Sequence, residues 1–377
     1  MAPRAHQTGM NARIAAILVV LLAVLGGGAI LYYQQEKARR PSNVGTLGQK
    51  LLKELKASDV ASIRIVEPKA TLTLQRREDR WTIAELAGFP ADYARVREFV
   101  VKALELKVGQ SEPIGEKDRA RLNLDASGTQ LEFNAADGKA LAKLFVGRKY
   151  FRGQPEDAAK AIGDGRFVML PGEEKTVYVV SDPLVQATTR SAEWIDRGSF
   201  QVEKVKTLEV RYPGGEGWRI ERSADNSDWK LAGAKPGEKI EVTKANSASY
   251  SLSLLDLADV APKDAKDTGL DKPILVNATT LDGLSYEIKV GKLEGENYYV
   301  GFASGGTLIK ERTPEKNEKA EDKERREKEQ AERVKKIEER LPREKMLSGY
   351  VLLIPKSKLE DTLKKRAELL EKKEQKK

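Results

Sequence analysis

The chain has 377 residues, which suits about two ordinary domains, and 40% of them are hydrophobic, enough to build their cores. It contains no Cys and one His, which excludes zinc fingers, haem attachment, iron–sulfur ligation, cysteine nucleophiles and Ser-His-Asp triads. Its net charge of +9 comes from three segments: residues 1–40 carry +4, residues 311–345 carry +1 and residues 356–377 carry +4. The rest is neutral, so we expect no nucleic-acid partner, which would need a concentrated basic face.

The first expected element is a transmembrane signal anchor over residues 14–33, which follows a short cytoplasmic leader over residues 1–13. Residues 14–31 carry no charged side chain. At about 1.5 Å per residue they would extend about 27 Å, close to the thickness of a hydrocarbon core. Tyr32 and Tyr33 would then lie at the membrane interface. The alternative is a cleaved signal peptide, although the apolar run is long for one.

The charges that flank this span do not decide its orientation, because Arg4 and Arg13 precede it while Lys37, Arg39 and Arg40 follow it. A short basic leader before one apolar span favours a signal anchor with the large domain outside the cytoplasm. We therefore expect a single-pass protein of the inner (cytoplasmic) membrane, with residues 34–58 as a juxtamembrane linker and the C-terminal domain in the periplasm.

The rest of the chain predicts an α+β fold in which one β-rich module occurs twice. The first copy covers residues 59–190. Alternating apolar residues indicate three strands, at 60–66, 70–76 and 80–85, and Asp92 can cap the helix that follows them. Four more strands and a helix that begins at Pro183 complete the predicted order βββαββββα. Those strands are expected at residues 129–134, 140–147, 166–170 and 176–180.

A connector over residues 191–204 leads to the second copy, residues 205–377, in which the main features of the first return. Strands are expected at 205–210, 218–221 and 228–231, before a helical stretch that ends at Leu257. Asp282-Gly283 repeats the turn at Asp137-Gly138, and Val290-Gly291 repeats Val146-Gly147. The final strand, 350–353, precedes a helix with a capping box from Ser357 to Glu360.

The second copy differs by an inserted charged helix within residues 311–345. Thr313 is the expected N-cap, Pro314 the first helical residue and Pro342 the stop after Leu341. Acid-to-base pairs four residues apart support the helix; they are Glu315/Lys319, Glu321/Arg325, Glu324/Lys328, Glu329/Arg333 and Glu332/Lys336. Ala331, Val334, Ile337 and Leu341 form the only apolar seam. The insertion is therefore either a solvated arm docked at its base or a partner-binding arm.

Two other features could carry chemistry but have simpler structural interpretations. Residues 172–176, GEEKT, lack the upstream glycine of a phosphate loop and precede a strand, so we expect a turn. The four tryptophans could form a sugar- or peptide-binding platform, but their alternation along strands favours core positions; they are Trp81, Trp194, Trp218 and Trp229. We predict no catalytic, cofactor-binding or metal-ligating residue and no cofactor.

Several short motifs resemble those of the bacterial domain-of-unknown-function 4340 family. They are Gly48–Leu52, Asp59–Ile63, Gly88–Asp92, Trp194–Arg197 and Gly349–Leu352. The resemblance covers nearly the whole chain and is structural, so it transfers no catalytic or ligand-binding residue. It implies a single-pass inner-membrane component that works with an ABC-type permease, its ATPase and a gliding-motility-type auxiliary subunit.

The leading hypothesis is thus a non-enzymatic, membrane-anchored periplasmic accessory subunit of an ABC-type transport or envelope-remodelling complex, in which a partner hydrolyses ATP. The alternative is a stand-alone envelope binding protein that captures a glycan, lipid or peptide between its two modules. A structural scaffold at the cell surface is a third possibility. Co-purification of a permease and an ATPase, or of a small molecule alone, would distinguish the first two.

Overall fold

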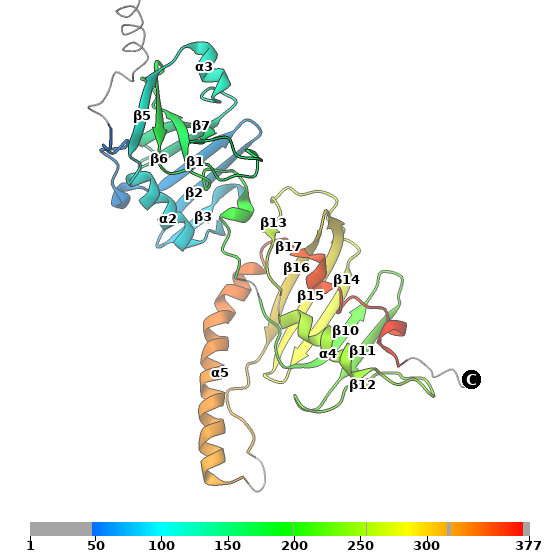
Figure 1. Cartoon of the computed structure of the whole chain (residues 1–377). Helices are drawn as coiled ribbons and strands as arrows, with labels where there is room; N and C mark the ends of the chain where they lie inside the picture. Colours follow the sequence, from blue (N-terminus) through cyan, green and yellow to red (C-terminus); the bar gives the residue numbers. More distant parts are fainter. Residues whose placement is uncertain (1–46, 199, 254, 315–317, 372–377) are drawn as a thin grey trace, which may run out of the picture. The chain divides into compact units, whose positions relative to one another are not determined.

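The computed structural model describes residues 47–198, 200–253, 255–314 and 318–371. Within these residues the chain forms two antiparallel sheets and five α-helices (Figure 1). The fold is mostly β, so the predicted α+β class is wrong. The helices are few and most of them are short, and the backbone hydrogen bonds of both large assemblies are those of sheets.

The nine strands of the first sheet lie in the order β4-β3-β2-β1-β6-β7-β8-β9-β5. Their bounds are β1 (Ser62–Glu67), β2 (Ala70–Arg77), β3 (Arg80–Ile83), β4 (Phe89–Pro90), β5 (Val108–Pro113), β6 (Thr129–Asn134), β7 (Ala140–Tyr150), β8 (Gly165–Met169) and β9 (Thr176–Val180). The helices of this part are α2 (Tyr93–Leu104) and α3 (Glu116–Arg121). Strands β6 and β9 match the sequence prediction residue for residue. Strand β6 alternates apolar with polar side chains, whereas β9 is a short apolar run that is buried on both faces.

The eight strands of the second sheet lie in the order β12-β11-β10-β14-β15-β16-β17-β13. Their bounds are β10 (Val205–Arg211), β11 (Gly217–Glu221), β12 (Lys230–Leu231), β13 (Asp259–Val260), β14 (Ile274–Thr280), β15 (Leu284–Glu294), β16 (Asn297–Gly306) and β17 (Leu352–Pro355). The helices of this part are α4 (Val242–Tyr250), α5 (Ala320–Leu347) and α6 (Lys356–Leu359).

The two sheets share one strand order once the two-residue strand β4 is set aside. Strands β3-β2-β1-β6-β7-β8-β9-β5 correspond in turn to β12-β11-β10-β14-β15-β16-β17-β13. In each sheet the chain supplies three strands, then a helix, and then the strand that ends at the opposite edge of the sheet. An identical path of this length indicates that one topology is used twice.

A bulge at equivalent places strengthens this correspondence. The β7–β8 register shifts after Val146, and the β15–β16 register shifts after Val290. A Cβ on Gly147 would lie 2.3 Å from the carbonyl oxygen of Leu122, and one on Gly291 would lie 2.2 Å from that of Thr268. The next residue in each copy donates its N–H to that same oxygen. Both glycines are therefore required by a close backbone approach.

The predicted formula βββαββββα is also wrong in its details. Five strands follow the helix in each copy, because β5 and β13 were missed. Strand β5 buries only Val108 and Ser111 among polar neighbours, so it carries no alternating apolar signal. Pro183 does not open a helix, since Leu184 next to it adopts a positive φ of 48°. The last predicted helix shrinks to α6, which begins at Lys356 with no side-chain cap.

The helix expected after Asp92 is present as α2. The Asp92 Oδ1 atom accepts hydrogen bonds from the backbone N–H groups of Ala94, at 2.9 Å, and Arg95, at 3.2 Å. These bonds satisfy two donors of the first turn, so the predicted N-cap is confirmed. The helix buries Val96, Phe99 and Ala103 on one face.

Helix α5 differs from the predicted arm at both ends. Its N-cap is Lys319, not Thr313, and it continues through Pro342 to Leu347. A proline inside a helix removes one hydrogen bond and costs about 3 kcal/mol. Beyond it, Leu347 is buried and Arg343 Nη1 lies 2.7 Å from Asp196 Oδ2. This tertiary anchoring explains why the helix does not end at Pro342.

The predicted seam of α5 is partly right, and the predicted ladder of ion pairs is not what holds the helix. Val334 and Ile337 are buried and Leu341 is half-buried, whereas Ala331 is exposed. Arg333, which we paired with Glu329, instead contacts Asp282 with both its Nε and Nη2 atoms. The second half of α5 is thus part of the core of its domain.

Among the described residues, no helix is both long enough and apolar enough to cross a membrane. The predicted span at residues 14–33 and the leader at residues 1–13 lie outside the described residues.

Contacts within the chain divide it into two compact units. The first unit contains the described residues up to Val60, with Val66–Lys69 and Val100–Ala187, and includes a core cluster of Leu122, Leu124, Met169 and Val177. The second unit contains Ala61–Ile65, Ala70–Phe99 and the described residues from Thr188 onward. In its core, Phe200 stacks on Phe302 with 3.7 Å between ring centroids.

Candidate functional site

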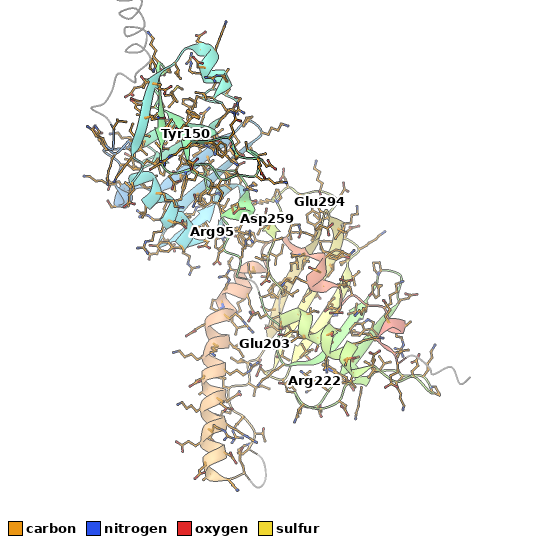
Figure 2. All side chains as sticks on the ribbon, viewed as in Figure 1. Arg95, Tyr150, Glu203, Arg222, Asp259 and Glu294 are labelled. Atoms are coloured by element: carbon orange, nitrogen blue, oxygen red, sulfur yellow. The ribbon has the colours of Figure 1, made fainter. Side chains whose placement is uncertain are left out.

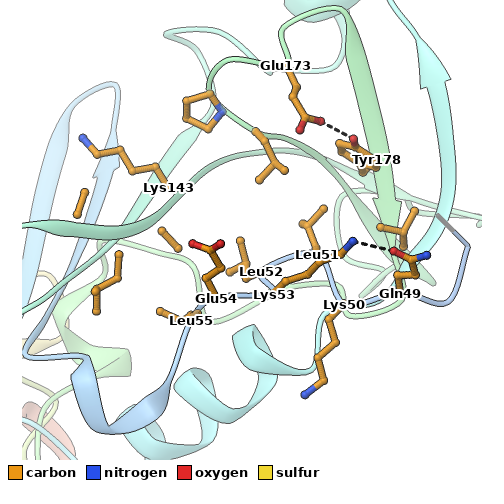
Figure 3. Close-up of a pocket in the computed structure, with 16 residues that line it drawn as sticks. Gln49, Lys50, Leu51, Leu52, Lys53, Glu54, Leu55, Lys143, Glu173 and Tyr178 are labelled. Atoms are coloured by element: carbon orange, nitrogen blue, oxygen red, sulfur yellow. Dashed lines mark hydrogen bonds between the residues drawn. The ribbon is translucent and has the colours of Figure 1, made fainter.

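A hollow of about 690 Å³ opens on the first unit, and Figure 3 shows it in close-up. Residues 49–55 form one wall. The rest of the lining comes from Val108 of β5, residues 140–143 of β7, Leu170, Pro171 and Glu173 between β8 and β9, and Tyr178 of β9. We call this hollow the leucine groove, after the leucines of residues 49–55.

Backbone hydrogen bonds fix the wall that carries these leucines. The N–H of Gly48 donates to the carbonyl of Val108 at 2.8 Å, and the N–H of Leu51 donates to the carbonyl of Leu106 at 2.8 Å. In return, the N–H of Val108 donates to the carbonyl of Gln49 at 3.0 Å. Residues 48–51 therefore pair with the start of β5 in the manner of a short strand.

This pairing places Leu51, Leu52 and Leu55 against the first unit, where all three are buried. Burying a leucine side chain contributes about 1.5–3 kcal/mol, so the segment is held by packing as well as by backbone hydrogen bonds. The apolar base of the leucine groove is thus a stable surface.

Tyr178 and Glu173 form a hydrogen-bonded pair on the other wall, in which the Tyr178 hydroxyl donates to a Glu173 carboxylate oxygen (Figure 3). Burial, and then the hydrogen bond and negative charge of Glu173, raise the pKa of Tyr178 to about 12. At neutral pH the Tyr178 phenol therefore keeps its proton and acts as a donor.

Charged side chains surround the groove, and several are paired within the first unit. Lys53 Nζ donates to Gln49 Oε1 at 2.7 Å, and Lys143 Nζ lies 3.0 Å from Glu132 Oε1. The Glu54 carboxylate points into the hollow, whereas the Lys50 amine points away from it (Figure 3). The rim is thus polar around an apolar base.

An apolar base with a paired polar rim suits the binding of an amphipathic chain. The volume falls in the range of about 300–1,000 Å³ that is usual for small-ligand sites. The pKa of Tyr178 is raised away from neutral pH, which makes this phenol a poor general base. The geometry therefore favours recognition over proton transfer.

The predicted turn at residues 172–176 lies beside this groove. Gly172 has φ of +90°, and its N–H donates to Glu174 Oε1 at 2.9 Å. The turn is confirmed. Its Glu173 contributes to the groove, a role that the sequence analysis did not predict.

The four tryptophans do not form an exposed platform. Their exposed fractions lie between 1% for Trp194 and 8% for Trp81, which confirms the predicted core positions. Trp81 lies on β3, and Trp229 immediately precedes β12, the corresponding strand of the second sheet. No group of three or more His, Asp or Glu side chains in the described part of the chain could hold a metal ion.

Residues 49–55 fall within the linker predicted over residues 34–58, so the groove was not predicted. The signal was present as Leu51-Leu52-Lys53-Glu54-Leu55, a cluster of leucines in an otherwise polar stretch. Linkers are usually rich in polar residues, whereas clustered leucines are typical of a segment that packs on a folded domain.

A sequence model of the family described as "Domain of unknown function (DUF4340)" matches residues 81–273, about half of the chain. The match begins in β3 and ends just before β14, so it includes strands of both sheets. Comparison with curated proteins and with solved structures gave no significant match.

Proposed function

Because the chain belongs to the DUF4340 family, we propose that it is a non-enzymatic accessory subunit of an ABC-type transport or envelope-remodelling complex. Its partners are a permease, an ATPase that hydrolyses ATP, and an auxiliary envelope subunit. In this proposal residues 14–33 anchor the protein in the inner membrane, and the two units lie in the periplasm. An active C-terminal alkaline phosphatase fusion would support this topology, and an active cytosolic reporter at the same end would contradict it.

The observation that carries the proposal is the position of the leucine groove along the chain. Its wall, residues 49–55, begins a short distance after the proposed anchor. From Tyr33 to Leu47 the chain can extend at most about 48 Å, at about 3.4 Å per residue. The groove would therefore stay close to the membrane surface, within reach of a juxtamembrane segment of a permease or auxiliary subunit.

The chemistry of the groove suits such a segment. An amphipathic helix or strand would place its apolar side chains on Leu141, Leu170 and Pro171, which line the groove and are more exposed than its buried leucines. Its polar side chains would lie against the rim. Lys53, Glu54 and Glu173 offer charges of both signs there, which would set the orientation of the partner.

Helix α5 supplies a second surface for assembly. Its C-terminal half is anchored by Arg333 to Asp282 and by Arg343 to Asp196. The chain that leads into it lies along the helix, since Gln330 Nε2 donates to the carbonyl of Ile309 at 3.1 Å and Lys310 pairs with Glu338 at 2.7 Å. The charged first half, residues 320–332, is therefore held at a fixed place from which it can contact a partner.

Co-purification of the full chain in a mild detergent tests the proposal, with permease and ATPase as the expected companions. Leu141→Lys introduces a charge into the groove at a half-buried position and should abolish the co-purification. Ile162→Lys is the matched control, because Ile162 is 66% exposed and does not line the groove. It should leave the complex intact, and both variants should melt as the wild type does.

A complex that survives Leu141→Lys would show that the leucine groove is not the docking site. Absence of a permease and ATPase from the wild-type preparation would refute the accessory role itself.

The alternative, a stand-alone envelope binding protein, is favoured by the volume of the groove, which would accommodate a lipid chain or a short peptide. A small molecule that co-purifies without any protein partner, and that Leu141→Lys displaces, would support this alternative.

A further inference from the structure

A second hollow, of about 590 Å³, lies in the second unit between α4 and the loop that follows β11. Its lining includes Glu203, Arg222 and Asp225 on one side and Asn246, Tyr250 and Ser253 on the other. Figure 2 shows Glu203 and Arg222 beside α4. We call this hollow the α4 groove.

One face of α4 and the turn after it forms the first wall. Asn246, Tyr250 and Ser253 follow at four- and three-residue spacing, so they project from the same side of the helix. Tyr250 lines the hollow but is 65% exposed, so its ring does not fill the hollow. Its ring therefore offers an apolar face to a ligand.

The Asn246 amide has a fixed orientation. Trp229 Nε1 donates to Asn246 Oδ1 at 2.8 Å. An indole N–H can only donate, so it selects the oxygen of the amide and turns the NH2 group away. Asn246 thus presents a donor.

Two serine hydroxyls on this wall, those of Ser249 and Ser253, have the opposite role. Ser249 Oγ donates to the carbonyl of Asn246 at 3.0 Å, and Ser253 Oγ donates to the carbonyl of Tyr250 at 2.7 Å. Each hydroxyl has one proton, and it is used in these bonds. Both oxygens can only accept a hydrogen bond from a ligand.

Charged groups on the second wall are held in pairs. The Arg222 guanidinium lies 4.6 Å from the centre of the Trp229 ring, and its Nη2 atom is 2.7 Å from Asp225 Oδ1. Glu203 Oε2 lies 3.3 Å from Arg340 Nη1 and 3.9 Å from Arg333 Nη1. These pairs leave the wall with fixed donors and acceptors. Lys204 also lines the hollow, so the lining carries three cationic and two acidic side chains.

This arrangement selects among ligand classes. A phosphate or carboxylate only accepts, so it would leave the serine oxygens without a donor and would lie near Glu203 and Asp225. An ammonium group only donates, and it would meet Arg222 and Arg333. A hydrocarbon would leave the polar groups of both walls without partners. A neutral ligand whose groups both donate and accept satisfies both walls, and sugar hydroxyls do so.

We infer that the α4 groove is a saccharide-binding site, in which one sugar ring lies on the face of Tyr250 while its hydroxyls bridge Asn246 and Ser253 to Asp225 and Glu203. This inference does not depend on the leucine groove or on an ABC-type complex, because it uses residues of the second unit only.

The probe is a library of neutral trisaccharides of glucose, galactose, mannose and N-acetylglucosamine. It is titrated into the full chain in a detergent without a sugar head group. Trp229 lies directly behind Asn246, so tryptophan fluorescence should report binding. We expect saturable binding of at least one trisaccharide at millimolar concentrations or below, and no displacement by inorganic phosphate.

Two variants test the assigned residues. Tyr250→Ala removes the stacking face, and Asn246→Asp keeps an acceptor for Trp229 but replaces the NH2 donor with oxygen. Each should weaken binding at least about tenfold, the effect of losing one good contact. Tyr93→Ala is the control, since Tyr93 is a similarly exposed tyrosine on α2, remote in sequence and not part of the lining.

Three results would overturn the inference. The first is that no trisaccharide of the library shows saturable binding. The second is displacement of the sugar by phosphate, which would indicate an anion site. The third is equal affinity of Tyr250→Ala and Tyr93→Ala, provided that both variants melt like the wild type.

Discussion

The pair of Arg333 and Asp282 anchors α5 to the turn between β14 and β15. Arg333 Nε lies 3.0 Å from both carboxylate oxygens of Asp282, and Nη2 makes a further bond to one of them. The Asp282 side chain is 8% exposed and that of Arg333 is 22% exposed. The hydrogen bonds that Arg333 donates to Asp282 raise the pKa of Arg333, as expected for a charged group with a close partner of opposite charge.

Arg333→Met removes the charge and keeps much of the apolar stem. Breaking a buried pair from one side costs about 3–5 kcal/mol, and the partial exposure of Arg333 reduces this to about 2–4 kcal/mol. The matched control is Arg325→Met on the same helix. Arg325 pairs with Asp322 at 2.8 Å, but its side chain is 64% exposed, so we expect a loss of less than about 1 kcal/mol.

Denaturant unfolding of the full chain in detergent, followed by tryptophan fluorescence, measures both losses. A double variant with Asp282→Asn should lose less than the sum of the two single changes, because the two residues interact directly. Equal effects of Arg333→Met and Arg325→Met would refute the conclusion that the second half of α5 belongs to the core.

Three further predictions concern stability. Burial raises the pKa of Glu344 in the folded protein. The contribution of Glu344 to folding stability is therefore fully present below the pKa of the unfolded carboxyl and is lost as the pH rises through the folded pKa. Glu344→Gln should melt at a higher temperature than the wild type at pH 7, and the difference should shrink in acid. Trp229→Ala should cost about 3–5 kcal/mol in denaturant unfolding, since Trp229 is buried and its Nε1–H is bonded to Asn246. Gly147→Ala and Gly291→Ala should each cost at least about 1–3 kcal/mol, because both would force a Cβ against a carbonyl oxygen; a marked loss in only one of them would count against equivalent bulges.

Much of each sheet could be predicted because its strands are buried on one face. Strand β6 alternates strongly, β9 is a short apolar run, and the repeated Asp-Gly turns and Val-Gly pairs identified corresponding hairpins. Edge strand β5 could not be predicted, because an edge tolerates polar residues and a terminal Pro113. The end of α5 was misplaced for a different reason, since the contacts of Arg343 with Asp196 outweigh the local effect of Pro342.

The leucine cluster of residues 51–55 indicates a packed segment, but local patterns do not show that either groove forms. The leucine groove requires that residues 48–51 pair with residues 106–108, and such pairing has no signature in either segment. The α4 groove depends on the hydrogen bond of Trp229 to Asn246, which sets the direction of one amide. Sequence periodicity shows that a residue is buried, but it does not show which partner fixes its side chain.

Site-specific photo-crosslinking in living cells tests the proposed accessory role most directly. A photoreactive amino acid at Lys53, on the rim of the leucine groove, should crosslink to a membrane permease or auxiliary subunit, and the same probe at Ile162 should not. Crosslinks to lipid alone, or to no protein at either position, would contradict an accessory subunit that docks through this groove.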